Sequence, residues 1–226
     1  MLKIKYLSHS SFILDDGKHS IIIDPFLTGN PNCKMKIEDV KVDYVVLTHA
    51  HGDHIGDCKQ IAKQNNATVI AVNELANYAA SEGLNAFNMH IGGAYKFPFG
   101  RLKFTIAHHG SSLPNGQYMG SPAGVLITID GKTIYHTGDT GLFLDMKLIG
   151  ELDKVDLMCV CIGDCFTMGI DDAVKAVEFV NPELAIPMHY NTFPVIETDP
   201  FEFKEKVEKK LGKKARVMEF GETITI

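Results

Sequence analysis

Long apolar runs and an excess of positive charge are both missing from this sequence of 226 residues. The longest apolar run, residues 157–162, falls far short of the roughly 20 residues that a membrane-spanning helix needs. With 22 Lys and Arg against 28 Asp and Glu, the net charge of −6 provides no long-range attraction for nucleic acid or an anionic membrane. The composition therefore predicts no nucleic acid and no membrane as a partner.

An even cysteine framework and an export signal are missing as well. The five cysteines are an odd number, and Cys159, Cys161 and Cys165 fall together in and beside an apolar stretch, which fits reduced thiols. The first ten residues read as a strand rather than as a charged region followed by an apolar core and a cleavage site. We therefore expect a cytoplasmic protein.

No linker rich in Pro, Gly or Ser divides the sequence, and no repeat of 20–50 residues is visible. At about 150 residues per domain, residues 1–226 are predicted to form a single domain. A chain of this length buries a sizeable core without disulfides or a structural metal. A homo-oligomer is left open.

Apolar patterning and turn residues predict mixed α/β (α+β) structure. Strands are expected at residues 3–7, 11–14, 20–24, 44–47, 68–72, 85–89, 94–97, 101–107, 123–129, 132–136, 157–162, 184–188, 215–218 and 223–226. Helices are expected at residues 56–64, 74–81, 171–180 and 201–211. Antiparallel sheet is expected to dominate the middle segment. Each half of the chain begins with strands and ends in a βαβ unit, which predicts two mixed sheets with helices outside.

The unusual motif is His49-Ala50-His51-Gly52-Asp53-His54, placed where a strand ends and a helix begins. In an extended stretch His49 and His51 project from the same side, and Gly52 is expected to turn the chain sharply so that Asp53 and His54 face the same point. Imidazole and carboxylate are ligands for zinc, iron or manganese, and a site without thiolate is more often catalytic than structural. The motif therefore predicts two adjacent metal positions.

Four side chains cannot complete two coordination spheres, so further donors are expected at other strand ends. His109, Asp139 and His189 each follow an apolar strand and precede a loop. They are the candidates for the missing ligands.

The order of these motifs resembles the metallo-β-lactamase superfamily over essentially the whole chain. Individual motifs resemble the UPF0173 type of metal-dependent hydrolase, among them His9-Ser10-Ser11-Phe12, Asp24-Pro25-Phe26-Leu27-Thr28-Gly29, Met89-His90-Ile91-Gly92-Gly93, Gly163-Asp164-Cys165-Phe166-Thr167-Met168-Gly169 and Pro187-Met188-His189-Tyr190. The resemblance implies a four-layer αββα sandwich with the metals at one edge. It also implies that His49, His51 and His109 hold one metal, that Asp53, His54 and His189 hold the other, and that Asp139 bridges them.

The same resemblance implies a hydrolase with two divalent ions, zinc first and manganese, iron or nickel as alternatives. A hydroxide shared by the two ions would attack an ester-type bond, either a phosphodiester or a lactone or carboxylic ester. Asp53 would orient this nucleophile, and His9 is a candidate helper in the chemistry. An iron-dependent oxidoreductase and a non-catalytic metal-binding module remain the alternatives.

Three further residues have roles that the resemblance or the strand pattern suggests. Asp24 is expected to orient a ligand histidine by a hydrogen bond. The position before Gly110-Ser111-Ser112 selects His109 over His108 as the ligand, because neighbours on a strand alternate faces. His108 and His136 are expected to be structural.

Overall fold

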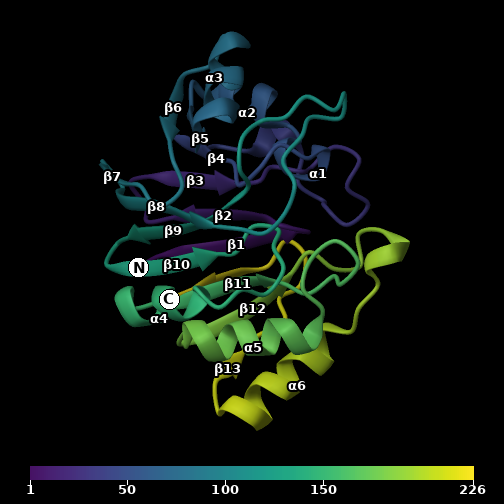
Figure 1. Cartoon of the computed structure of the whole chain (residues 1–226). Coiled ribbons are helices and arrows are strands. Elements are labelled where there is room, and N and C mark those ends of the chain that lie inside the picture. Colours follow the sequence, from purple (N-terminus) through teal and green to yellow (C-terminus); the bar gives the residue numbers. More distant parts are fainter.

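The computed structural model describes all residues 1–226 and contains two seven-stranded sheets packed face to face, with helices on both outer faces (Figure 1). The first sheet has the order β14-β1-β2-β3-β4-β5-β6, and the second has the order β13-β12-β11-β10-β9-β8-β7. This is the predicted αββα sandwich. No helix has the length and apolar character needed to span a bilayer.

The first sheet contains β1 (Lys3–Ser8), β2 (Ser11–Asp15), β3 (Ser20–Ile23), β4 (Tyr44–Val46), β5 (Thr68–Val72), β6 (Ala86–Met89) and β14 (Thr223–Thr225). The helices α2 (Cys58–Asn65) and α3 (Asn73–Ser81) pack on β4, β5 and β6. Strands β1 to β3 are antiparallel, whereas β3 to β6 are parallel. Strand β6 therefore continues the parallel part of the first sheet, whereas the other strands expected in the middle segment pair antiparallel with one another, as predicted.

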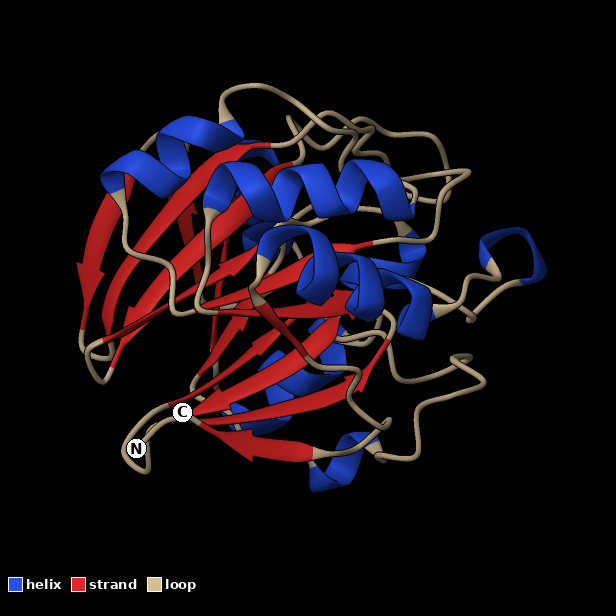
Figure 2. Ribbon diagram, turned by 90° about the horizontal axis from the view of Figure 1, so that it is seen from below, coloured by secondary structure: helices blue, strands red, loops and turns tan.

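The second sheet contains β7 (Ala94–Phe97), β8 (Gly100–Ile106), β9 (Ala123–Ile129), β10 (Lys132–His136), β11 (Leu157–Cys161), β12 (Leu184–Met188) and β13 (Lys214–Ala215). The helices α4 (Met146–Leu152), α5 (Ile170–Val180) and α6 (Pro200–Leu211) form the layer outside it, nearest the viewer in Figure 2. Short 3-10 helices occur at η1 (Ile37–Asp39) and η2 (Pro194–Ile196). One apolar cluster of 66 buried residues joins the two sheets and their helices.

The two ends of the chain lie side by side, away from the loops that follow β10, β11 and β12 (Figures 1 and 2). Leu2 and Ile226 exchange two backbone hydrogen bonds, which adds β14 to the edge of the first sheet. The C-terminal strand thus closes the sheet beside the N-terminal strand.

The segment that follows β4 differs from the expected single helix at residues 56–64. A four-residue helix, α1 (Gly52–Ile55), comes first, and α2 begins only at Cys58. Gly56 separates them with φ +36°, and a Cβ there would overlap the carbonyl oxygen of Pro25. At Gly52 the chain changes direction, from extended at His51 to helical in α1, and a second turn with positive φ follows at Gly56.

Candidate metal centre

The strands that carry the predicted donors all end at one edge of the sandwich, at the right in Figure 1. His9 follows β1, Asp24 follows β3, His109 lies after β8, Asp139 after β10 and His189 after β12. Pairing in the second sheet makes β8, β10 and β12 point the same way, and β1, β3 and β4 share a direction in the first. The topology therefore collects residues from the whole chain at one place.

His49, His51 and His109 form the first group of donors. Nε2 of His49 lies 3.0 Å from Nδ1 of His51, which lies 3.2 Å from Nε2 of His109. Nitrogen ligands about 2.0–2.1 Å from a tetrahedral zinc are separated by about 3.3 Å, so this spacing suits a common metal ion. The three ring nitrogens thus converge as ligands would.

Asp53, His54 and His189 form the second group, and His9 joins them. Oδ2 of Asp53 lies 4.0 Å from Nε2 of His54 and 4.0 Å from Nε2 of His189, and Nε2 of His9 lies 3.1 Å from the same oxygen. Donor atoms of these four residues all lie within 4.8 Å of one another. The structure therefore brings together the three donors expected for a second ion.

Asp139 lies between the two groups. Its Oδ2 is 2.9 Å from Nε2 of His189, 3.3 Å from Nε2 of His54 and 3.6 Å from Nε2 of His109. No other carboxylate of the chain comes within 4.0 Å of histidines from both groups. This is the placement that a bridging ligand requires.

Several polar atoms at the centre are buried without a hydrogen-bond partner. They include Nε2 of His54, Nε2 of His189 and Oδ1 of Asp139. Burying such atoms unpaired costs about 1–3 kcal/mol each, and native proteins rarely leave them so. A cation bound among the donors would satisfy them, so the side chains present fit the metal ions that the motif predicts.

Hydrogen bonds behind the donors fix which ring nitrogen faces the centre. Nδ1 of His54 donates to Oδ2 of Asp24 at 2.7 Å, and Nδ1 of His49 lies 3.0 Å from the hydroxyl of Thr48. That hydroxyl donates to Asp24 at 2.6 Å. Asp24 thus orients His54 directly and His49 through Thr48, and it leaves their Nε2 lone pairs free. Sequence reasoning had named Asp24 but had missed Thr48.

His9 is held by a second contact that sequence reasoning missed. Its Nδ1 lies 2.9 Å from the hydroxyl of Thr192, and its Nε2 contacts Asp53. Because an ionised carboxylate only accepts, Nε2 carries the proton and the Thr192 hydroxyl donates to Nδ1. The ring therefore connects the loop after β12 to Asp53, and only the position of Thr192 three residues after His189 could have suggested it.

Burial and charge set the protonation states of the centre. Burial lowers the pKa of His49, His51 and His109, and burial together with His189 lowers the pKa of His9 to about 4. Burial opposes ionisation of Asp139, but His189 and His54 outweigh it and hold the pKa of this carboxyl well below its usual range. Neutral imidazoles and an ionised carboxylate are the states that bind metal.

His54 is the exception among the histidines. Burial lowers its pKa, but the carboxylates of Asp139 and Asp24 raise it well above the usual value. These two carboxylates therefore attract positive charge to the space that Nε2 of His54 faces.

The adjacent histidine, His108, lies outside the centre. It is exposed, and its ring stacks on Phe143 with ring centroids 5.0 Å apart. His136 is buried, where Nε2 donates to the carbonyl of Ser10 and Nδ1 accepts from the amide of Gly138. Both contacts match the structural roles expected for them. His136 also supports the loop that carries Asp139.

The centre opens to solvent on one side. Asp53 is 27% exposed and His109 is 15% exposed, whereas His49, His54, His189 and Asp139 are buried. A substrate would therefore approach past Asp53, His51 and His109, with the remaining donors beneath.

The chain is similar to several known proteins. A family model described as the beta-lactamase superfamily domain matches residues 3–189. A UPF0173 metal-dependent hydrolase from Bacillus cereus is 53% identical, with 100% of both chains covered. The solved structure of Igni18, a metallo hydrolase from Ignicoccus hospitalis, is 40% identical, with a TM-score of 0.93 over 100% of this chain and 98% of that one.

The same fold also occurs with another chemistry. The structure of CmlA, a diiron beta-hydroxylase from Streptomyces venezuelae, has a TM-score of 0.79 at 12% identity, with 100% of this chain and 54% of that one covered. At this identity only the fold is shared. The fold alone therefore does not separate hydrolysis from oxidation, whereas the relatives of high identity are metal-dependent hydrolases.

Proposed function

The chain belongs to the UPF0173 metal-dependent hydrolases of the beta-lactamase superfamily, and from this we propose that it uses two divalent metal ions to hydrolyse an ester-type bond. The position of Asp139 carries the proposal, because its Oδ2 lies within 3.6 Å of histidines from both donor groups. His49, His51 and His109 would hold one ion, and Asp53, His54 and His189 the other. Bound there, the ions would lower the pKa of a water molecule and polarise a C=O or P=O group.

Asp53 and His9 are the side chains best placed to assist. Asp53 is the most exposed carboxylate of the centre, and its Oδ2 can accept a hydrogen bond from the attacking water and so orient it. His9 donates to the same oxygen and keeps the carboxylate from rotating. In the overall reaction the water oxygen bonds to the acyl carbon or the phosphorus, the bond from that atom to the leaving oxygen breaks, and one of the two water protons passes to the leaving oxygen.

Zinc is the first candidate for both ions, with manganese, iron and nickel as alternatives. All four accept imidazole nitrogen and carboxylate oxygen, and the nitrogen spacing of the first group suits tetrahedral zinc. If the ions are iron, an iron-dependent oxidoreductase is the alternative function. All seven donors converge, which argues against a metal-binding module without catalysis.

The proposed setting is the cytoplasm, with a small-molecule substrate and no nucleic-acid or membrane partner. All five cysteines are free thiols, and Cys159 and Cys161 are buried in β11 as small apolar side chains. This supports a reducing compartment. Self-association into a homo-oligomer stays open.

The test combines metal analysis with an activity panel. Purified protein should contain about two transition-metal ions per chain, as expected for a two-metal site, and should cleave at least one member of a panel of chromogenic phosphodiesters, lactones and thioesters. Asp139→Ala should lose at least one ion, whereas Asp164→Ala, an exposed acid at the same edge, should keep both. Two ions retained in Asp139→Ala would exclude the bridging role, and an inactive protein with two ions would exclude the hydrolase.

A further inference from the structure

Around the mouth of the centre, basic side chains are scarce and acidic side chains are numerous. Five of the loops at this edge, residues 47–57, 107–122, 137–145, 162–169 and 189–199, contain no Lys or Arg. A sixth, residues 24–36, contains Lys34 and Lys36. Lys34 lines a separate hollow with Lys5, Leu7 and Phe220, none of them a donor. The mouth therefore has almost no positive side chain with which to bind an anionic substrate.

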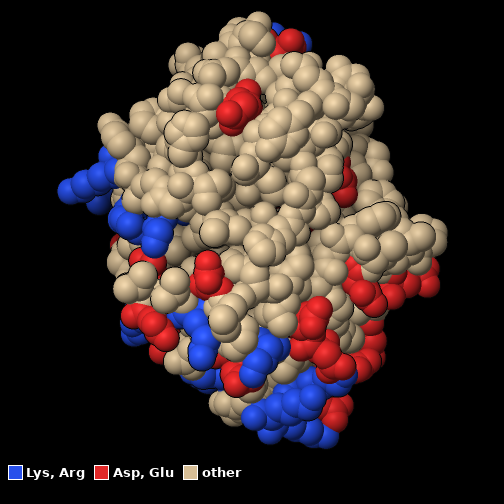
Figure 3. Space-filling model, viewed as in Figure 1, with Lys and Arg blue, Asp and Glu red and all other residues tan.

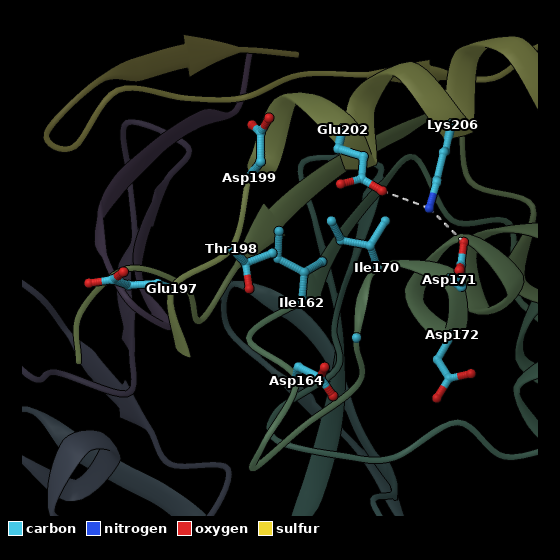
Figure 4. Close-up of a pocket in the computed structure, with 11 residues that line it drawn as sticks. Ile162, Asp164, Ile170, Asp171, Asp172, Glu197, Thr198, Asp199, Glu202 and Lys206 are labelled. Atoms are coloured by element: carbon cyan, nitrogen blue, oxygen red, sulfur yellow. Dashed lines mark hydrogen bonds and ion pairs between the residues drawn. The ribbon is translucent and has the colours of Figure 1, made fainter. Parts of the chain in front are cut away.

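Acidic side chains surround a hollow of about 530 Å³ between the loops that follow β11 and β12 and the first turns of α5 and α6 (Figure 4). Gly163 lies between two residues of its lining, and a Cβ on Gly163 would come 3.1 Å from Nδ1 of His189. The acids of the lining are Asp164, Asp171, Asp172, Glu197, Asp199 and Glu202, and Lys206 is its one base. Figure 3 shows acidic side chains gathered at the lower right, where α5 and α6 begin.

The loaded centre itself would add little positive charge. Asp24, Asp53 and Asp139 carry three negative charges, which offset most of the charge of two divalent ions. The acidic surroundings therefore set the sign of the potential that a substrate meets, and potentials of this kind alter association by about 10- to 1000-fold.

Two phenylalanine rings pack against His9, the residue that donates to Asp53. The rings of Phe26 and Phe193 lie 5.7 and 5.6 Å from the ring of His9, and stack on each other at 6.3 Å. Phe193 is half-buried, and Val195 two residues later is 59% exposed. Phe26 is buried at 9% exposure, so Phe193 is the more accessible ring of this aromatic wall. The wall lies against His9, which donates to the carboxylate proposed to orient the attacking water.

We propose that the substrate is an uncharged carboxylic ester or lactone whose acyl chain packs on Phe26 and Phe193, rather than a phosphodiester or another anion. The inference rests on the proposed ester hydrolysis. The scarcity of basic side chains at the mouth disfavours anions, and the aromatic wall favours an apolar acyl group.

Two matched esters isolate the charge of the substrate. p-Nitrophenyl pentanoate and the mono-p-nitrophenyl ester of adipic acid share the p-nitrophenyl leaving group and a straight aliphatic acyl chain, but the second carries a carboxylate at the far end of that chain. At low ionic strength, kcat/KM should be at least about tenfold higher for the pentanoate, and the ratio should shrink as salt rises because salt screens the repulsion. The rate enhancement over the uncatalysed reaction should be smaller for bis-p-nitrophenyl phosphate than for p-nitrophenyl pentanoate.

Charge reversal at the acidic hollow provides the control. Glu197→Lys should raise kcat/KM for the adipate ester about threefold or more at low salt and leave the pentanoate unchanged. Glu151→Lys makes the same charge change near the C-terminal end of α4, shortly before β11 begins and therefore far from the ends of the strands that carry the donors. It should leave kcat/KM unchanged for both esters. Phe193→Ala should reduce the preference for p-nitrophenyl pentanoate over the acetate while the protein keeps its metal.

The outcomes of these experiments distinguish failure of the uncharged-substrate inference from failure of the proposed ester hydrolysis. Equal or faster cleavage of the adipate ester at low salt, or preferred cleavage of the phosphodiester, would overturn the uncharged-substrate inference and leave the hydrolase standing. If protein carrying two ions cleaves no ester at all, both the uncharged-substrate inference and the proposed ester hydrolysis are overturned.

Discussion

Three residues of the centre share an unusual backbone conformation at the end of a strand. His9, Asp24 and His189 each come directly after a strand and have φ values of +55°, +45° and +58°. The left-handed conformation costs a residue with a side chain about 1–2 kcal/mol, and such strain concentrates at functional sites. Here it turns the chain at once and aims each side chain at the centre.

Residue identities could be predicted from the sequence, but these orientations could not. The spacing of His49, His51, Asp53 and His54 is a local pattern, so it is visible in the sequence alone. The hydroxyls of Thr48 and Thr192 have roles that depend on hydrogen bonds to Asp24 and His9, which lie in other segments of the chain. A threonine at a strand end has many other uses, so nothing local marks it.

Substitution of the two adjacent histidines after β8 tests the residue assignment. His109→Ala should lose one metal ion and lower kcat/KM by about 100-fold or more, because its Nε2 is one of three converging nitrogens. His108→Ala should keep both ions and most activity, since His108 is exposed and touches Phe143 instead. Metal analysis and a progress curve for each variant test which of the two histidines is the ligand. The reverse pattern would assign the ligand role to His108 instead of His109.

At the scale of elements, strong periodicity predicted most strands and the long helices within one or two residues. The hairpin of β9 and β10 and the strand β12 were confirmed with the expected bounds. The elements not predicted were α1 and α4, with four and seven residues, and the 3-10 helices η1 and η2, with three residues each. Helices this short owe their stability to tertiary packing rather than to their own sequence, so periodicity carries little signal for them.

The turn between α1 and α2 positions the second donor group, and two glycines test it. Gly56→Ala should reduce the free energy of unfolding by about 3 kcal/mol or more, because φ +36° is unfavourable for alanine and its Cβ would overlap the Pro25 backbone. Gly52→Ala should change it by less than about 1 kcal/mol, since the new Cβ would meet only Pro114 at 3.7 Å. Urea unfolding of the metal-free proteins measures both, and equal destabilisation would place the turn at Gly52 instead.

At the scale of the whole molecule, the centre and the core occupy different places. The 66 residues of the apolar cluster run through both sheets, and the donors lie at one edge where the strands end. The αββα architecture was predictable because each half of the chain repeats strands followed by βαβ. The pairing of strands from the two ends of the chain, β14 with β1, was not, since it depends on long-range register alone.

Removal of metal should therefore abolish activity and leave the fold. A core of this size does not depend on a structural ion, unlike small zinc domains that unfold without one. Chelation should keep the far-UV circular dichroism unchanged at 25 °C while the melting temperature falls, because the carboxylates of Asp24, Asp53 and Asp139 lose the cations that balance them. Activity should return on addition of zinc or manganese. Loss of the circular dichroism signal on chelation would instead make the ions part of the folding free energy, and the donors could then no longer be treated as a site added to a self-sufficient scaffold.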